Sequence, residues 1–274
     1  MPHFTAPDGL SLYYTDEGEG LPILCLSGLT RTTADFDYVT PHLSDCRLIK
    51  TDYRGRGQSD WAKDHMTYSI PVEVGDVLAL MDHLGLEKAA ILGTSRGGLV
   101  AMAMGVAATD RILGVAFNDI GPVIEPVGIE FIKNYIGRNP VWKTHAEALR
   151  ELPKVMKGFD NIPESRWAEE VRKLYNETED GLEITYDPRL RDAVLEAGAQ
   201  PAPDLWPLFD GLVGKPMAVI RGANSNLLSQ DTVAEMARRD PDLIVAEVPD
   251  RGHIPFLDEP EAVEALRAWV GKLG

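Results

Sequence analysis

Short apolar runs alternate with helix-like stretches along the chain. Residues 10–15 alternate apolar and polar side chains like a half-buried strand, whereas 22–26 is a continuous apolar run typical of a fully buried strand. Residues 72–84 have apolar side chains at helical spacing, and 99–108 is apolar nearly all round, which predicts a buried helix. The same reasoning predicts further strands at 47–52, 88–93, 113–117, 217–220 and 243–248.

This alternation predicts an α/β fold. Strands that are linked by helices cannot pair as hairpins, so we expect a mostly parallel central sheet with helices on both faces. Ligands bind such sheets at the carboxyl ends of the strands. We therefore look for functional residues directly after each predicted strand.

The alternation stops between residues 121 and 210, where helix-like patterns continue without a convincing buried strand. We interpret 121–210 as an inserted helical cap on a core made of 1–120 and 211–274. The apolar stripes of the cap pack either onto the strand ends or only against one another, and the pattern leaves both open. One such stripe predicts a single helical face for Trp167, Val171, Leu174 and Tyr175.

The overall charge narrows the range of partners. Lys and Arg number 27 against 43 Asp and Glu, a formal net charge of −16, which disfavours nucleic acid and anionic membranes as partners. No apolar run approaches the roughly 20 residues that a membrane span requires.

Two cysteines, Cys25 and Cys46, are too few for a disulfide scaffold and favour a reducing, cytoplasmic location. No metal-binding or nucleotide-binding motif occurs, so we expect no cofactor and a small-molecule substrate.

A glycine-rich turn follows the strand at 88–93. Residues 93–98 read Gly-Thr-Ser-Arg-Gly-Gly and lead into the buried helix. A G-x-S-x-G turn from strand to helix lifts the serine hydroxyl above the sheet, and its glycines permit the crowding. Ser95 is therefore the candidate nucleophile, and the alternative is a serine that only caps the helix.

Four segments in order resemble the landmarks of the α/β-hydrolase fold family. They are Ser27-Gly28-Leu29, 52–59 (Asp-Tyr-Arg-Gly-Arg-Gly-Gln-Ser), 93–98 and 252–255 (Gly-His-Ile-Pro). The resemblance covers 1–120 and 211–274, and the middle of the chain matches only as a helical cap by position. Relatives with alkyl-enzyme chemistry attack with a carboxylate at the turn, so a serine there indicates acyl transfer.

The base and the oxyanion hole follow from chemistry and from this resemblance. A serine hydroxyl needs a base with a pKa near neutrality, and His253, after the strand at 243–248, is the candidate that the resemblance also selects. Backbone N–H groups stabilise the oxyanion of acyl transfer. We expect the N–H of Arg96, after the nucleophile, and by resemblance that of Leu29.

The residue that would orient His253, the acid of a Ser-His-acid triad, does not stand where the resemblance implies it. The resemblance implies an aspartate at the end of R-G-x-x-S-D, but 221–226 reads Arg-Gly-Ala-Asn-Ser-Asn, so Asn226 stands there. An asparagine accepts the histidine N–H but does not stabilise the imidazolium, and a comparable change in a serine protease lowers turnover about 10⁴-fold. Three explanations stay open. The acid is Asp119, or the chain is an engineered variant, or the protein is a natural weak catalyst or a binding protein. If Asp119 is not the acid, we expect it to cap a turn.

The sequence therefore predicts a serine hydrolase that cleaves a small carboxylic ester or lactone through an acyl-enzyme. A carbon–carbon bond hydrolase using the same serine and a ligand-binding pseudoenzyme are the alternatives. Arg54 and Arg56, in the glycine-rich 52–59 segment, either bind an acidic substrate or belong to a structural element. Neither the substrate nor the oligomeric state follows from the sequence.

Overall fold

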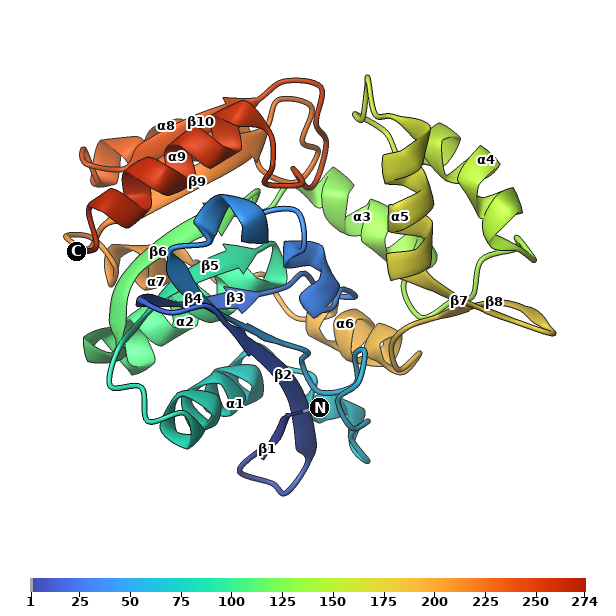
Figure 1. Cartoon of the computed structure of the whole chain (residues 1–274), viewed down its shortest axis with the longest axis horizontal. Helices are drawn as coiled ribbons and strands as arrows, with labels where there is room; N and C mark the ends of the chain where they lie inside the picture. Colours follow the sequence, from blue (N-terminus) through green and yellow to red (C-terminus); the bar gives the residue numbers. More distant parts are fainter. Residues whose placement is uncertain (1) are drawn as a thin grey trace.

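The computed structural model describes residues 2–274. Among these residues, eight strands form one sheet in the order β1-β2-β4-β3-β5-β6-β9-β10 (Figure 1). The six strands from β4 to β10 are parallel, and β2 and β1 extend one edge antiparallel. The strands are β1 (His3–Thr5), β2 (Ser11–Glu17), β3 (Leu21–Leu26), β4 (Cys46–Thr51), β5 (Ala89–Thr94), β6 (Ile112–Asn118), β9 (Met217–Gly222) and β10 (Ile244–Val248).

Both faces of the sheet are covered, which is why its central strands are apolar throughout. Alternate side chains of one strand enter different cores: Leu24 and Leu26 pack with α1 and α2, whereas Ile23 and Cys25 pack with α9. The helix α8 joins the α1 and α2 side through Met236. These helices are α1 (Ile70–His83), α2 (Arg96–Ala107), α8 (Gln230–Arg239) and α9 (Pro260–Gly271). The predicted fold class, a mostly parallel sheet with helices on both faces, is confirmed.

Several elements lie between β6 and β9, and Figure 1 shows α4, α5 and the β7–β8 hairpin as a lobe at one side of the sheet. Apolar side chains of α4, α5 and β8 pack against one another, whereas Leu190 of α6 packs against Tyr68 near the sheet. The cap side chains therefore do not pack only against one another. The elements are α3 (Pro126–Tyr135), α4 (His145–Val155), α5 (Glu164–Leu174), β7 (Tyr175–Thr178), β8 (Gly181–Ile184), α6 (Leu190–Gly198) and α7 (Trp206–Asp210).

The structure corrects one detail of the predicted cap. Tyr175 does not continue the helical face of Trp167 and Val171, because α5 ends at Leu174 and Tyr175 begins the β7–β8 hairpin. Most of β7 is exposed, so it lacks the apolar run by which a buried strand is recognised. The cap boundaries of 121–210 are a proposal, and the packing of Phe209 in α7 against Phe117 of β6 argues for ending the cap before α7.

Candidate active site

Ser95 lies at the turn between β5 and α2, with φ 50° and ψ −112°. A side chain at Gly97 would collide with the carbonyl oxygen of Leu26, and one at Gly93 would come within 2.7 Å of the Gly97 backbone. Since only glycine fits at these two positions, the turn brings α2 directly against the ends of β3 and β5. The positive φ of Ser95 is a conformation that a non-glycine residue adopts only when its surroundings impose it.

The structure brings Ser95, His253 and Asp119 together from three strand ends. His253 Nε2 lies 2.9 Å from Ser95 Oγ, and His253 Nδ1 lies 2.7 Å from Asp119 Oδ2. A carboxylate only accepts, so Nδ1 carries the proton and Nε2 of the neutral imidazole accepts from the serine hydroxyl. In this tautomer the histidine is oriented to take the serine proton.

Asp119 directly follows β6 and is fully buried. Its Oδ1 accepts from the N–H of Gly222 at 2.8 Å, and its Oδ2 accepts from Ser225 Oγ at 2.6 Å. The hydroxyl of Ser225 has its own acceptor sites occupied by the N–H groups of Leu227 and Leu228, so its proton points to the carboxylate. A buried carboxylate with three donors is held in one orientation.

Asn226 occupies the position where the family pattern has an acid. It is half-buried, and its backbone carbonyl oxygen would lie 2.9 Å from a side chain added at Gly128 of α3. Within residues 2–274, no hydrogen bond joins Asn226 to His253. Of the two acid positions that the sequence offered, Asp119 is the one that contacts the histidine.

Leu29 and Arg96 both border the serine. A side chain added at Gly28 would lie 3.8 Å from Ser95 Cβ, so the loop after β3 runs beside the nucleophile. The carbonyl of Gly28 accepts from the N–H of Arg31 at 3.2 Å, which directs the N–H of Leu29, on the same planar peptide, the opposite way. Arg96 is the first residue of α2, where N–H groups have no acceptor within the helix.

Sequence reasoning did not identify the contacts between this loop and the lobe. Arg31 Nη2 lies 2.6 Å from Glu170 Oε2 on α5, and its Nε donates to Asp35. Tyr38 also donates to Glu170, at 3.0 Å. The Arg31–Glu170 ion pair and the hydrogen bond from Tyr38 to Glu170 tie α5 to the loop beside Ser95. Because Arg31 and Glu170 are far apart in the chain, no local pattern signals the pair.

Tyr135, at the end of α3, lies near the same loop. Burial raises the pKa of its phenol to about 12, against the opposing charge of Arg31.

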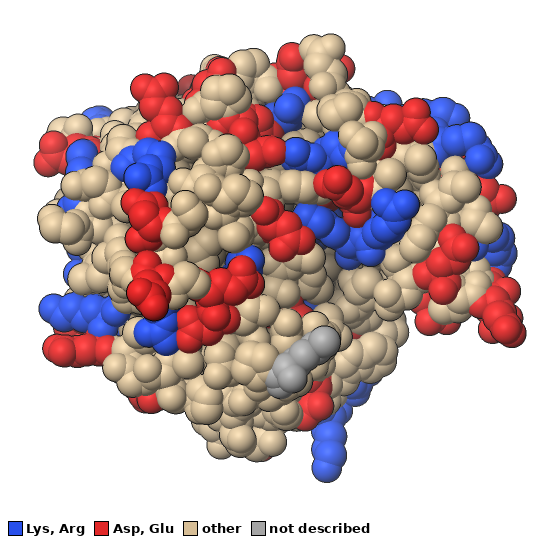
Figure 2. Space-filling view, viewed as in Figure 1, with Lys and Arg blue, Asp and Glu red and all other residues tan. Residues whose placement is uncertain are grey.

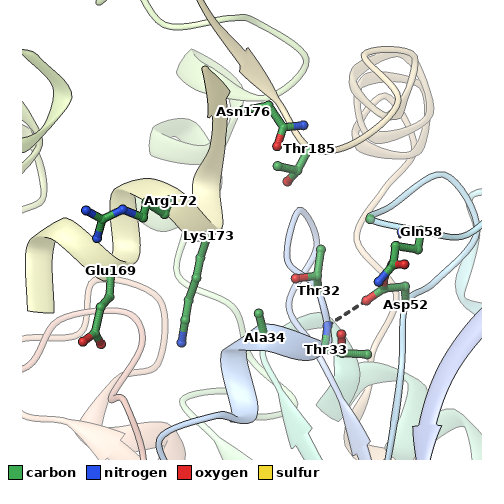
Figure 3. A pocket seen from close by; sticks show the side chains of 11 residues that line it. Thr32, Thr33, Ala34, Asp52, Gln58, Glu169, Arg172, Lys173, Asn176 and Thr185 are labelled. Carbon is green, nitrogen blue, oxygen red and sulfur yellow. Dashed lines mark hydrogen bonds between the residues drawn. The ribbon is translucent and has the colours of Figure 1, made fainter. Parts of the chain in front are cut away.

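A separate cavity of about 540 Å³ lies on the border between the lobe and the core (Figure 3). Core residues 32–34 and Asp52 form one wall, and Lys173 at the end of α5 lies along the other. Asp52 accepts from the N–H of Thr33 at 2.7 Å, which holds this wall in place. Neither Ser95 nor His253 lines the cavity.

The two arginines of the 52–59 segment have protein partners. Arg54 pairs with Asp76 and Asp8, and Arg56 pairs with Glu73. Both guanidinium groups are buried, with at most 1% of the side chain exposed, so of the two open interpretations the structure favours a structural element over a substrate-binding one.

The charged surface has no patch of one sign on the face that Figure 2 shows, where acidic and basic side chains are interspersed. Within the described residues, no group of three or more His, Cys, Asp and Glu side chains is arranged to hold a metal ion. No helix in residues 2–274 combines the length and apolar character needed to cross a membrane.

Comparison with known proteins identifies the family. A model of the alpha/beta hydrolase family matches residues 23–266. The chain is 36% identical over 259 residues to a 3-hydroxybutyrate-oligomer hydrolase from Cupriavidus necator, covering 91% of this chain and 88% of that protein. It is 26% identical over 255 residues to a 2-(acetamidomethylene)succinate hydrolase from Mesorhizobium japonicum, covering 92% and 88%. The solved structure of an alpha/beta hydrolase from Novosphingobium aromaticivorans superposes with a TM-score of 0.91 at 35% identity, covering 99% of this chain and 97% of that one. With the strand-turn-helix geometry of the fold, these matches show that the chain belongs to the alpha/beta hydrolase family.

Proposed function

We propose that this hydrolase cleaves small carboxylic esters, lactones included, through an acyl-enzyme. Ser95 is the nucleophile, His253 the base and then the acid, and Asp119 the residue that orients the histidine. The observation that carries the proposal is the continuous hydrogen-bonded series Asp119–His253–Ser95, with distances of 2.7 and 2.9 Å. A serine in this setting has an acceptor for its proton and is suited to attack an acyl carbon.

In the first half-reaction, Ser95 Oγ attacks the carbonyl carbon while its proton passes to His253 Nε2. The carbonyl oxygen becomes an oxyanion, which accepts from the N–H groups of Leu29 and Arg96. The buried Asp119 carboxylate stabilises the imidazolium that forms. When the tetrahedral intermediate collapses, the bond to the alkoxy oxygen breaks and His253 gives its proton to the leaving alcohol.

In the second half-reaction, His253 takes a proton from water, and the resulting oxygen nucleophile attacks the acyl-enzyme. A second oxyanion forms in the same place and collapses, the bond to Ser95 Oγ breaks, and the proton returns to the serine. The products are the carboxylic acid and the free enzyme. Each backbone donor of an oxyanion hole typically contributes about 3–4 kcal/mol to such steps.

The acid position bears on the alternative of a ligand-binding pseudoenzyme, which rested on the asparagine at 226. With Asp119 in the acid role, Asn226 does not impair turnover, so the contact between Asp119 and His253 supports catalysis over binding alone. The Cupriavidus necator relative is named for an oligomer of 3-hydroxybutyrate. Short esters of hydroxy acids are therefore the first natural substrates to compare with aryl esters.

The test is hydrolysis of p-nitrophenyl butyrate by the protein and by its Ser95→Ala variant. We expect turnover by the protein and a loss of about 10³-fold or more in the variant, since the nucleophile is removed. A fluorophosphonate should label Ser95, as located by mass spectrometry. Turnover that survives in Ser95→Ala would remove the serine from its proposed role.

A further inference from the structure

A buried ion cluster joins the two residues that supply the proposed oxyanion donors. Glu73, on α1, has no exposed surface, and its Oε2 accepts from Arg96 Nε at 2.7 Å. Its Oε1 lies 3.0 Å from Nη1 of Arg56, which is also fully buried. One carboxylate therefore accepts a hydrogen bond from Arg96, at the start of α2, and forms an ion pair without a hydrogen bond with Arg56, in the loop after β4.

Arg56 extends this cluster to the backbone of Leu29. Its Nε donates to the Leu29 carbonyl at 2.9 Å, and its Nη1 donates to the Arg54 carbonyl at 2.6 Å. The preceding peptide is held by the bond from the N–H of Arg31 to the Gly28 carbonyl. Because peptide units are planar, bonds on both sides of Leu29 fix the direction of its N–H.

Arg96 is held in a similar way on the other side of the serine. Its Nη2 donates to the carbonyl of Tyr68 at 3.0 Å, in addition to the bond with Glu73. The carbonyl of Ser95 accepts from the N–H of Gly98 at 2.9 Å, which fixes the peptide that carries the N–H of Arg96. The two donors thus share one support, although 67 positions separate Leu29 from Arg96.

The cluster carries two positive charges and one negative charge. Arg56 lies over the rings of Tyr53 and Tyr68, at 5.6 and 5.5 Å, and its Nη2 has no hydrogen-bond acceptor among the described residues. Burial lowers the pKa of Arg56, and the charge of Arg96 adds to that effect against the opposing effect of Glu73. A buried cation without full compensation costs stability. Stability therefore does not explain why Arg56 is buried near the active site, whereas a role in that site does.

We propose that Arg56 and Glu73 are positioning residues that hold the N–H groups of Leu29 and Arg96 in the oxyanion hole. This inference rests on the proposed serine hydrolase function. It assigns the arginine of the Gly55-Arg56-Gly57 turn to transition-state stabilisation and not to substrate binding. The effect acts through Leu29 and Arg96, since neither Arg56 nor Glu73 touches the reacting atoms.

The central experiment compares Arg56→Lys with Arg54→Lys. Lysine keeps the charge but lacks the fork that bonds the Leu29 carbonyl. We expect Arg56→Lys to lower kcat about 10–100-fold while KM stays within about threefold, because loosened donors affect the transition state more than the bound ester. Arg54 is an equally buried arginine of the same segment that pairs with Asp76 and Asp8 instead. Arg54→Lys should lower the melting temperature and leave kcat of the folded protein within about twofold.

A second readout separates positioning from packing. A trifluoromethyl ketone forms an oxyanion adduct with an active-site serine. The corresponding trifluoromethyl carbinol, which has no carbonyl group, forms no such adduct. Arg56→Lys should weaken binding of the ketone about as much as it lowers kcat and leave carbinol binding within about threefold. If Arg56→Lys does not fold, Arg96→Met, at a side chain that is 12% exposed, gives the same comparison.

Two outcomes would overturn the inference. An equal loss of kcat in Arg54→Lys and Arg56→Lys overturns it, because the loss then comes from disturbing the segment. Unchanged ketone binding in a folded Arg56→Lys or Arg96→Met variant also overturns it. Both results leave the hydrolase proposal intact as long as Ser95→Ala abolishes turnover, whereas turnover without Ser95 would refute that proposal first.

Discussion

The loops after β6 and β9 lie side by side at the carboxyl end of the sheet, and they contribute differently to the site. The first provides the side chain that contacts His253, and the second helps to hold that side chain. The two strands are parallel neighbours, with Asn118 opposite Ile220, and the N–H of Asp119 donates to the Ile220 carbonyl at 2.7 Å. The β6 loop supplies the carboxylate that contacts His253. Gly222, the last residue of β9, and Ser225, in the loop after it, donate to that carboxylate.

The carboxylate that contacts His253 therefore comes from the loop after β6 and not from the loop after β9. Carboxyl ends of neighbouring parallel strands meet at the same level, so either loop can place a side chain near the histidine. Here Asp119 has φ 55° and is buried beneath the imidazole, while the β9 loop keeps the serine of the family pattern and has Asn226 next to it. The following changes test this division of roles, from the largest expected effect to the smallest.

Exchange of Asp119 for asparagine should have the largest effect. Asp119→Asn keeps the shape of the side chain but removes the charge that stabilises the imidazolium. Its NH2 group must also face a donor, either the N–H of Gly222 or the pair Ser225 Oγ and His253 Nδ1. We expect kcat to fall about 10⁴-fold with an aryl ester, at unchanged concentration of folded protein. A loss of less than about tenfold would return the acid role to another residue.

Removal of the Ser225 hydroxyl should have an intermediate effect. Ser225→Ala deletes the 2.6 Å bond to Asp119 Oδ2, and a hydrogen bond to a charged group contributes about 1.5–3 kcal/mol. We expect kcat to fall about tenfold, because the carboxylate keeps its bond to Gly222 and loses part of its fixed orientation.

Ser229→Ala is the matched control for Ser225→Ala. Ser229 lies in the same loop and caps α8, where its hydroxyl accepts from the N–H of Thr232. Loss of this cap should cost about 1 kcal/mol of stability and leave kcat unchanged. Equal kcat in Ser225→Ala and in the unmodified protein would show that Asp119 needs no support from the β9 loop.

Restoration of the aspartate of the family pattern should have the smallest effect. Asn226→Asp places a carboxylate where the side chain makes no bond to His253, so we expect kcat to change by less than about threefold. Steady-state rates at several pH values measure this directly. A rise of tenfold or more would instead mean that position 226 orients the histidine and that Asp119 has the lesser part.

The strands and the nucleophile turn were predictable because their signals are local. Buried strands such as 22–26 read as apolar runs, and the turn at Ser95 reads as glycines spaced around a serine. The hairpin at Tyr175 was not predictable, since most of β7 is exposed and carries no apolar run. The packing of α7 against β6 was also hidden, because a five-residue helix has too few positions to show which face is apolar.

The amino-acid sequence by itself determined the main strands of the core, the helices at 72–84 and 99–108, the serine at the turn and the histidine after the last strand. These depend on residues that are neighbours in the chain, where periodicity and steric demands act directly. Only the tertiary structure decided which residue contacts that histidine and that Glu73 lies between Arg56 and Arg96. Such contacts join side chains from separate strand ends and a helix, and their distances exist only once the sheet and its covering helices have packed.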